Sequence, residues 1–116
     1  MSNTKDFDIL AISRETYKQY AIQVKTTSSK SKTWTLTKKS ENLVGDNIIY
    51  VFVTLNDLES PEYHIVPSKV VSERIKNDHQ EWLNTPGRKG QPHNDNNIRK
   101  FSDIDDIYLD KWGIME

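Results

Sequence analysis

Short segments of this chain alternate apolar and polar residues, which is the pattern of strands that bury one face. The clearest segment is 33–37, in which Trp34 and Leu36 point to the same side. Residues 6–12 and 20–26 also predict strands, and the polar residues between them predict the turn of a hairpin.

Residues 48–55 differ from these segments because they are apolar, β-branched or aromatic almost without interruption. Such a run predicts a central strand that is covered on both faces. A further strand is expected at 62–66 and should end at Pro67. Residues 69–83 then carry apolar residues at helical spacing, with Ser68 placed as the N-cap of that helix. The stripe that should pack on the sheet comprises Val71, Ile75 and Trp82.

The C-terminal third carries fewer periodic signals. Residues 84–97 are rich in Gly, Pro and Asn and predict a long loop, which in so small a domain is either functional or disordered. A short helix is expected around 102–107, with Ser102 as its N-cap and acids in its first turn. The apolar residues that should anchor this part of the chain are Phe101, Ile104, Ile107, Tyr108, Leu109 and Trp112.

These elements predict an α/β (α+β) fold, with a mixed, largely antiparallel sheet of about five strands and one main helix packed on it. The 116 residues fit one domain, 1–116, with a modest core because only 34% of them are hydrophobic. The absence of cysteine excludes a disulfide framework and a thiolate metal site. The sequence has no signal-type apolar region and no membrane-length run, so we expect a cytoplasmic protein without a membrane partner.

Charge is distributed unevenly along the chain, although the net charge is only −1. Residues 1–40 hold eight Lys and Arg against three acids, and residues 41–116 hold eight against fourteen. The stretch 25–39 contains five lysines and no acid and could follow a phosphate backbone. The alternative is a solvated hairpin edge whose lysines block edge-to-edge aggregation. The candidate nucleic-acid contacts in this stretch are Lys30, Lys32, Lys38 and Lys39.

A second basic candidate lies in the predicted loop. Residues 86–93 place Arg88 and Lys89 between two glycines, so exposed backbone N–H groups and two cations could together hold a phosphate. The alternative is a flexible connector whose charges face water.

Metal ligands of other kinds are not indicated by the sequence. The three histidines have no close two-histidine spacing and no cysteine beside them, which argues against zinc. The aspartates near the C-terminus, Asp103, Asp105 and Asp106, are expected to face water.

The most informative chemistry lies in the first predicted hairpin. Residues i and i+2 of a strand share a face, so Gln23 and Lys25 point together. A turn centred on residues 15 and 16 would place Asp8 opposite Gln23, bringing an acid, an amide oxygen and an ammonium to one place. Hard oxygen ligands beside a cation suit Mg²⁺ and a phosphodiester. The site requires Gln23 to face away from the helix-covered core, because a one-residue slip reverses every side chain.

This pattern resembles the PD-(D/E)XK nuclease superfamily in its Mrr-like variant, in which Gln replaces the acid of the E-x-K step. Asp8 matches the metal-binding Asp of that family, Gln23 and Lys25 match its Q-x-K, and the resemblance covers residues 6–66. It implies that Asp8 and Gln23 bind Mg²⁺ or Mn²⁺ and that Lys25 orients the attacking water and neutralises the developing charge. It also implies a restriction-endonuclease-like core and metal-dependent hydrolysis of nucleic acid, DNA rather than RNA.

The chain departs from that family in one respect. Only seven residues precede Asp8, too few for the helix that usually stands before this strand and often contributes another acid. The departure favours the alternative of a non-catalytic nucleic-acid-binding or protein-interaction module that kept the nuclease-like sheet. The stretches 63–68, 79–83 and 86–93 also look like those of small uncharacterised bacterial proteins with the same Q-V-K strand, and this likeness implies no particular function.

The sequence predicts a homodimer. The run 48–55 is apolar on both faces, and one main helix covers only one face of a sheet. The C-terminal residues could cover the other face within the same chain, which is the competing arrangement. We expect light scattering at micromolar concentration to give the mass of two chains; the mass of one chain, unchanged on concentrating, would leave the C-terminal segment as the cover.

Overall fold

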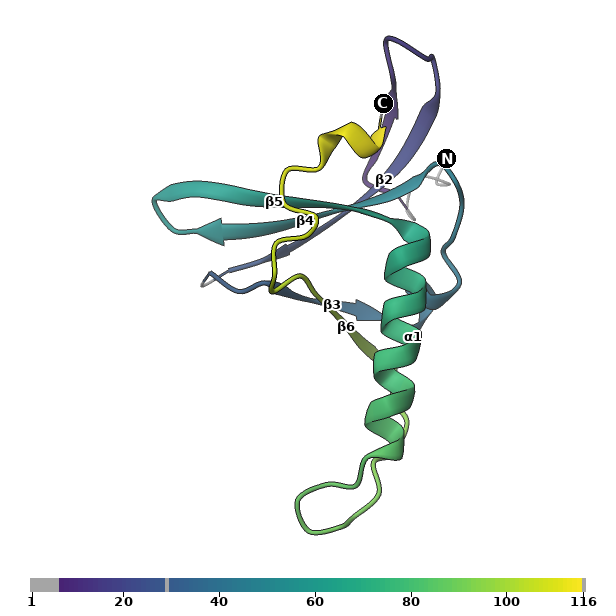
Figure 1. The fold of residues 1–116 in the computed structure, drawn as a ribbon, viewed down its shortest axis with the longest axis vertical. Helices are drawn as coiled ribbons and strands as arrows, with labels where there is room; N and C mark the ends of the chain where they lie inside the picture. The colour runs from purple at the N-terminus through teal and green to yellow at the C-terminus, as the bar shows by residue number, and fades with distance from the viewer. Residues whose placement is uncertain (1–6, 29, 116) are drawn as a thin grey trace.

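The computed structural model describes residues 7–28 and 30–115 and shows an α+β fold with two sheets and one main helix (Figure 1). A mixed four-stranded sheet has the order β1-β2-β4-β5, and a two-stranded sheet pairs β3 with β6. The strands are β1 (Ile9–Ile12), β2 (Gln19–Thr27), β3 (Thr33–Thr37), β4 (Ile48–Asn56), β5 (Glu59–Pro67) and β6 (Ile98–Ser102). The helix is α1 (Ser68–Asn84), and two short 3₁₀ turns are η2 (Lys38–Glu41) and η3 (Trp112–Met115).

The predicted fold class is therefore confirmed, with the strands divided between two sheets. β4 is the central strand, paired in parallel with β2 and antiparallel with β5. Its side chains alternate between two cores: Tyr50 and Phe52 enter one, and Ile49 and Val51 enter the other. The apolar run that predicted a strand covered on both faces is explained by this double burial.

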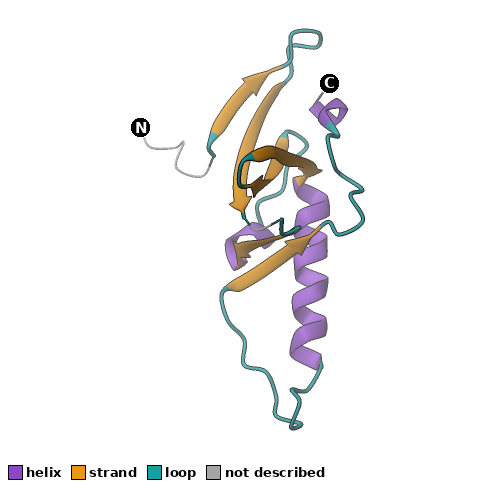
Figure 2. Ribbon diagram, turned by 90° about the vertical axis from the view of Figure 1, so that its left-hand side faces the viewer, coloured by secondary structure: helices purple, strands orange, loops and turns teal. Residues whose placement is uncertain are grey.

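The larger core lies between the four-stranded sheet, α1 and the β3–β6 pair, which α1 runs beside (Figure 2). At its centre Phe52 stacks on Tyr50 and on Phe101, with ring centroids 5.3 and 4.8 Å apart. From α1 the predicted residues Val71 and Ile75 enter this core. Among the described residues, neither α1 nor any other helix has the length and apolarity of a membrane span.

The third residue expected to pack on the sheet, Trp82, does not reach the core. Its side chain is 39% exposed, and its ring stacks on His93 with centroids 4.1 Å apart. The reason is geometric, because the C-terminal half of α1 extends past the edge of the sheets and meets the 85–97 loop there (Figure 1). That loop is tied to its surroundings by His93 Nδ1, which donates to the Trp82 carbonyl, and by His79, which bonds Asp95 at 2.8 Å. The bond to His79 is the main reason why the pKa of Asp95 lies below its usual value.

Two predicted caps are wrong. The N-cap of α1 is Pro67, whereas the buried Ser68 hydroxyl turns toward the loop before β4, accepting from the Gly45 N–H and donating to its carbonyl. The helix expected around 102–107 is absent, because β6 continues through Ser102, whose hydroxyl lies 2.8 Å from that of Thr33 on β3. Residues 103–107 form turns instead.

The second core lies on the opposite face of the four-stranded sheet and is built around Tyr20, Ile22, Ile49, Val51 and Ile65. The C-terminal segment packs against it through Ile114 and Met115, and the Trp112 ring lies tilted against that of Tyr63 on β5, with centroids 5.7 Å apart. This is the intrachain cover that competes with the homodimer, which stays a prediction.

Replacement of Ile114 by Asp should destabilise the fold, because a carboxylate would then lie against the second core. We expect the free energy of unfolding in urea to fall by about 2 kcal/mol. The matched control is Ile104→Asp, since Ile104 is 65% exposed and belongs to neither core. Equal stability of the two variants would show that the C-terminal segment does not hold this face.

Candidate functional site

The first hairpin forms in the predicted register. β1 and β2 are antiparallel with Ile9 opposite Ile22. Asp8 lies just before β1, in a bend, and its N–H donates to the Ile22 carbonyl. The Asp8 carboxylate is already engaged, because it accepts the backbone N–H of Val24 at 2.8 Å. The carboxylate thereby satisfies a backbone N–H of β2 that lies past the N-terminal end of β1.

Gln23 and Lys25 share a face, as predicted, but it is the wrong face for the predicted site. The β2–β4 register sets Gln23 beside Tyr50 and Lys25 beside Phe52, on the side where α1 packs. The alternation on β2 could not reveal which side the helix would take. The Gln23 Oε1 atom is buried and has no hydrogen-bond partner, and Lys25 is half-buried. No hydrogen bond or ion pair of the described residues joins Asp8 to either of them.

The predicted basic residues have separate environments. Lys30 pairs loosely with Glu59 at 3.5 Å, and Lys32 bonds Asp106. Lys38 and Lys39 lie exposed on η2, and Arg88 and Lys89 lie exposed in the 85–97 loop. The proposed phosphate nest in that loop is not open, because Gln91 accepts the N–H groups of Gly87 and Lys89, and the Gly87 carbonyl accepts that of Gly90.

A different polar group assembles around His64 on β5. His64 is 0% exposed and lies opposite Phe52 of β4. The Trp34 ring packs against the imidazole, with ring centroids 5.0 Å apart. The imidazole Nδ1 is 2.6 Å from the Asp103 carboxylate. The same carboxylate accepts the backbone N–H groups of Ile107 and Tyr108 at 3.0 and 2.9 Å.

The expectation that Asp103 faces water is therefore wrong, since it is only 3% exposed. The antiparallel pairing of β6 with β3 carries the chain back to β5, and the Asp103 N–H donates to the Lys32 carbonyl at that point. Burial of this carboxyl group is compensated because three donors replace its water. Neither the β3–β6 pairing nor the return to β5 has a local sequence signal.

The bond to Asp103 determines the state of the other imidazole nitrogen. Nδ1 donates to this carboxylate and so carries a proton, and in the neutral imidazole Nε2 then presents a lone pair. The Nε2 atom is buried and has no partner in the structure. An unpaired buried acceptor costs about 1–3 kcal/mol, so its retention calls for an explanation.

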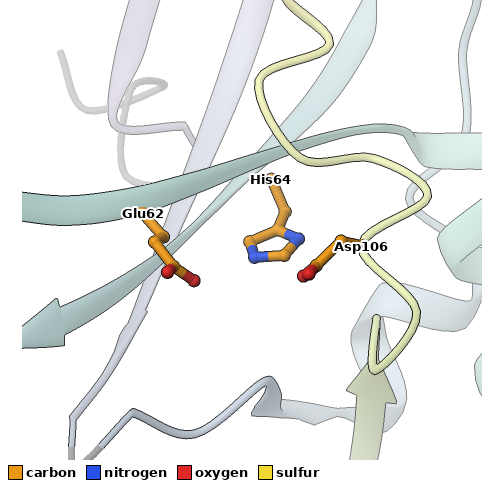
Figure 3. A group of neighbouring side chains, drawn as sticks. All are labelled: Glu62, His64 and Asp106. Carbon is orange, nitrogen blue, oxygen red and sulfur yellow. The ribbon is translucent and has the colours of Figure 1, made fainter.

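Two carboxylates flank that nitrogen. Glu62 lies two residues before His64 on β5 and so shares its face, and Asp106 comes from the turn after β6. Figure 3 shows the two carboxylates on either side of the His64 ring. One ligand atom from each of the three residues lies within 4.8 Å of the others. A tetrahedral ion with bonds of about 2.1 Å spaces its ligands about 3.4 Å apart, so closure by little more than an ångström would complete a metal site.

Lys32 is the cation of this cluster. Its Nζ lies 2.7 Å from both oxygens of Asp106, and this bond is the main reason why its pKa lies above the usual value. The charges of Glu62 and Asp103 act in the same direction. With His64 neutral, the formal charges of Glu62, Asp103, Asp106 and Lys32 sum to −2, which a divalent cation would neutralise.

Sequence reasoning missed this group, although part of it left a signal. Glu62 and His64 stand at i and i+2 within the predicted strand 62–66, so their shared face was predictable. Asp103 and Asp106 gave no such signal, because a turn and not a periodic element brings them to β5.

Comparison with known proteins adds nothing to this geometry: no family model, no curated protein and no solved structure matches the chain.

Replacement of Asp103 by Ala should cost about 3 kcal/mol in the free energy of unfolding, because it leaves the buried imidazole and two part-buried N–H groups without their acceptor. Asp105→Ala is the matched control, since Asp105 is exposed two residues away. Urea unfolding measures both. A loss no larger in Asp103→Ala than in the control would contradict the role given to this carboxylate.

Proposed function

We propose that this protein is a metal-dependent phosphodiester hydrolase whose divalent cation is held by Glu62, His64 and Asp106. The observation that carries the proposal is the buried, unpartnered Nε2 of His64 between two carboxylates. Metal-binding histidines characteristically donate their second ring nitrogen to a carboxylate, as Nδ1 does here to Asp103.

The donor set favours particular ions. One imidazole nitrogen and two carboxylates suit Mn²⁺ or Zn²⁺ better than Mg²⁺, which prefers oxygen ligands alone. This choice differs from the Mg²⁺ implied by the sequence resemblance and agrees with its second option, Mn²⁺.

Three protein ligands leave coordination positions open, which distinguishes catalytic from structural sites. His64 is buried, whereas Glu62 and Asp106 are partly exposed, so the open positions would face solvent. A divalent ion bound there would supply an activated water and polarise a phosphoryl oxygen. Addition of water to phosphorus would break one P–O ester bond, with the proton ending on the alcohol that leaves.

An anionic substrate is favoured by the lysine in the cluster. Lys32 belongs to the stretch 25–39, which contains five lysines and no acid, so the lysine of the proposed centre is part of the most basic segment of the chain. Nucleic acid, and DNA before RNA, is the polymer that such a stretch would follow. The resemblance to nucleases bears on the class of reaction alone. It does not supply the metal ligands, because Gln23 lies on the face of the sheet where α1 packs.

The second candidate is a metal-binding module without catalysis. It is favoured by the bond between Lys32 and Asp106, because a lysine held by a carboxylate is not presented to a substrate phosphate. The two candidates share the metal centre and differ only in hydrolysis.

Calorimetric titration with MnCl₂ tests the centre. We expect binding that Asp106→Asn and Glu62→Gln each weaken by at least about tenfold, and weaker binding of Mg²⁺. The matched controls, Asp105→Asn and Glu59→Gln, replace exposed acids on the same turn and strand and should bind Mn²⁺ like the unmodified chain.

Hydrolysis of bis(p-nitrophenyl) phosphate and of DNA with Mn²⁺ then separates the candidates. Cleavage that Asp106→Asn abolishes supports the hydrolase. Mn²⁺ binding that depends on Asp106, without cleavage of either substrate, supports the module. Binding that Asp106→Asn does not affect would refute the centre itself.

A further inference from the structure

One ligand of the proposed metal centre already carries a cation. Lys32 Nζ lies 2.7 Å from both Asp106 oxygens, so the carboxylate is held along the two directions in which it would bind a metal. The side chains of Lys32 and Asp106 are 28% and 36% exposed, so the pair lies at the mouth of the cluster and not at its base.

The backbone at Lys32 is fixed by hydrogen bonds, whereas its side-chain ammonium can change partner. The Lys32 carbonyl accepts the Asp103 N–H at 3.0 Å, and the Ser31 carbonyl accepts the Thr54 hydroxyl of β4 at 2.6 Å. The flexible four-carbon stem lets the ammonium leave Asp106 without moving this backbone. The released ammonium would remain within reach of any ligand bound beside His64.

A metal ion and the Lys32 ammonium compete for this carboxylate, because the ammonium holds both of its oxygens. An ammonium and a divalent ion within a few ångströms repel each other, and a half-buried site screens the repulsion less than water does. A metal ion at Glu62, His64 and Asp106 would therefore displace the ammonium from at least one Asp106 oxygen and weaken its hold on the other.

We propose that Lys32 is an exchangeable counter-ion: it neutralises Asp106 while the centre is empty, and it binds a phosphate oxygen of the substrate once a metal ion has taken Asp106. The inference rests on the proposed function, which supplies both the ion and the phosphodiester. In this arrangement the ion and the substrate are coupled, since only metal binding sets the substrate-binding ammonium free.

The inference makes opposite demands on two substitutions. Lys32→Met removes the internal competitor, so the apparent Kd for Mn²⁺ should fall by about tenfold, as expected when a competent state becomes fully populated. Lys32→Arg holds Asp106 through a two-pronged guanidinium and should bind Mn²⁺ more weakly than the unmodified chain. The control Lys111→Met, at an exposed position, should leave the Kd for Mn²⁺ unchanged.

Phosphodiester binding should follow the reverse order. The probe is diethyl phosphate, titrated by calorimetry in saturating Mn²⁺, so that no turnover is needed. The unmodified chain and Lys32→Arg should bind it, and Lys32→Met should bind it about tenfold more weakly through loss of a charge-assisted hydrogen bond.

The outcomes separate failure of the inference from failure of the proposed function. Mn²⁺ binding that depends on Asp106, with Lys32→Met binding no tighter than the unmodified chain, overturns the counter-ion role alone. Diethyl phosphate binding unchanged in Lys32→Met overturns the substrate role alone. Absence of Mn²⁺ binding in the unmodified chain and in Lys32→Met overturns the metal centre, and the inference with it. Mn²⁺ binding by Lys32→Met alone overturns the exchange and the proposed function of the unmodified chain, because Lys32 would then block the centre instead of yielding Asp106 to the metal.

Discussion

The buried carboxylate of Asp103 is the contact on which the candidate centre depends. It accepts the N–H groups of Ile107 and Tyr108 and bonds the imidazole of His64, so one side chain joins the turn after β6 to strand β5. The backbone N–H of Asp103 donates to the carbonyl of Lys32, in the loop before β3. Three segments far apart in sequence therefore meet at one carboxyl group whose burial would otherwise be costly.

The same contact gives the centre its chemical character. Asp103 accepts the proton of Nδ1, so that in the neutral imidazole Nε2 is an acceptor without a hydrogen-bond partner, in a ring that lies between Glu62 and Asp106. Trp34 packs on the ring and excludes water from that side. A fold that only needed to be stable would satisfy or remove such an atom, because a lost buried hydrogen bond is expensive. The unsatisfied nitrogen is therefore the feature that most needs a ligand to account for it.

Two groups on the same sheet face had the residue types for a cation site, and packing separates them. Lys25, Phe52 and His64 stand in one cross-strand row, with Trp34 lying against the rings of Phe52 and His64. The aromatic pair fills the space between the β2 side and the β5 side. Of these two groups, the one on the β5 side gathers two carboxylates, Glu62 and Asp106, around the imidazole of His64. The buried Oε1 of Gln23 stays without a partner, and no contact of the described residues accounts for it.

The sequence by itself determined the local elements and one register. Period-two and helical spacing located β1 to β5 and α1, but not β6. The polar turn correctly set Ile9 opposite Ile22, because side-chain alternation and turn length are local constraints. Tertiary structure decided the rest: which face α1 would cover, and hence that Gln23 lies on the packed side. It also decided that Asp103 is buried, since the pairing of β6 with β3 joins residues nearly seventy positions apart. A periodic pattern reports how much of a side chain is buried within one element, but it carries no information on which distant partner buries it.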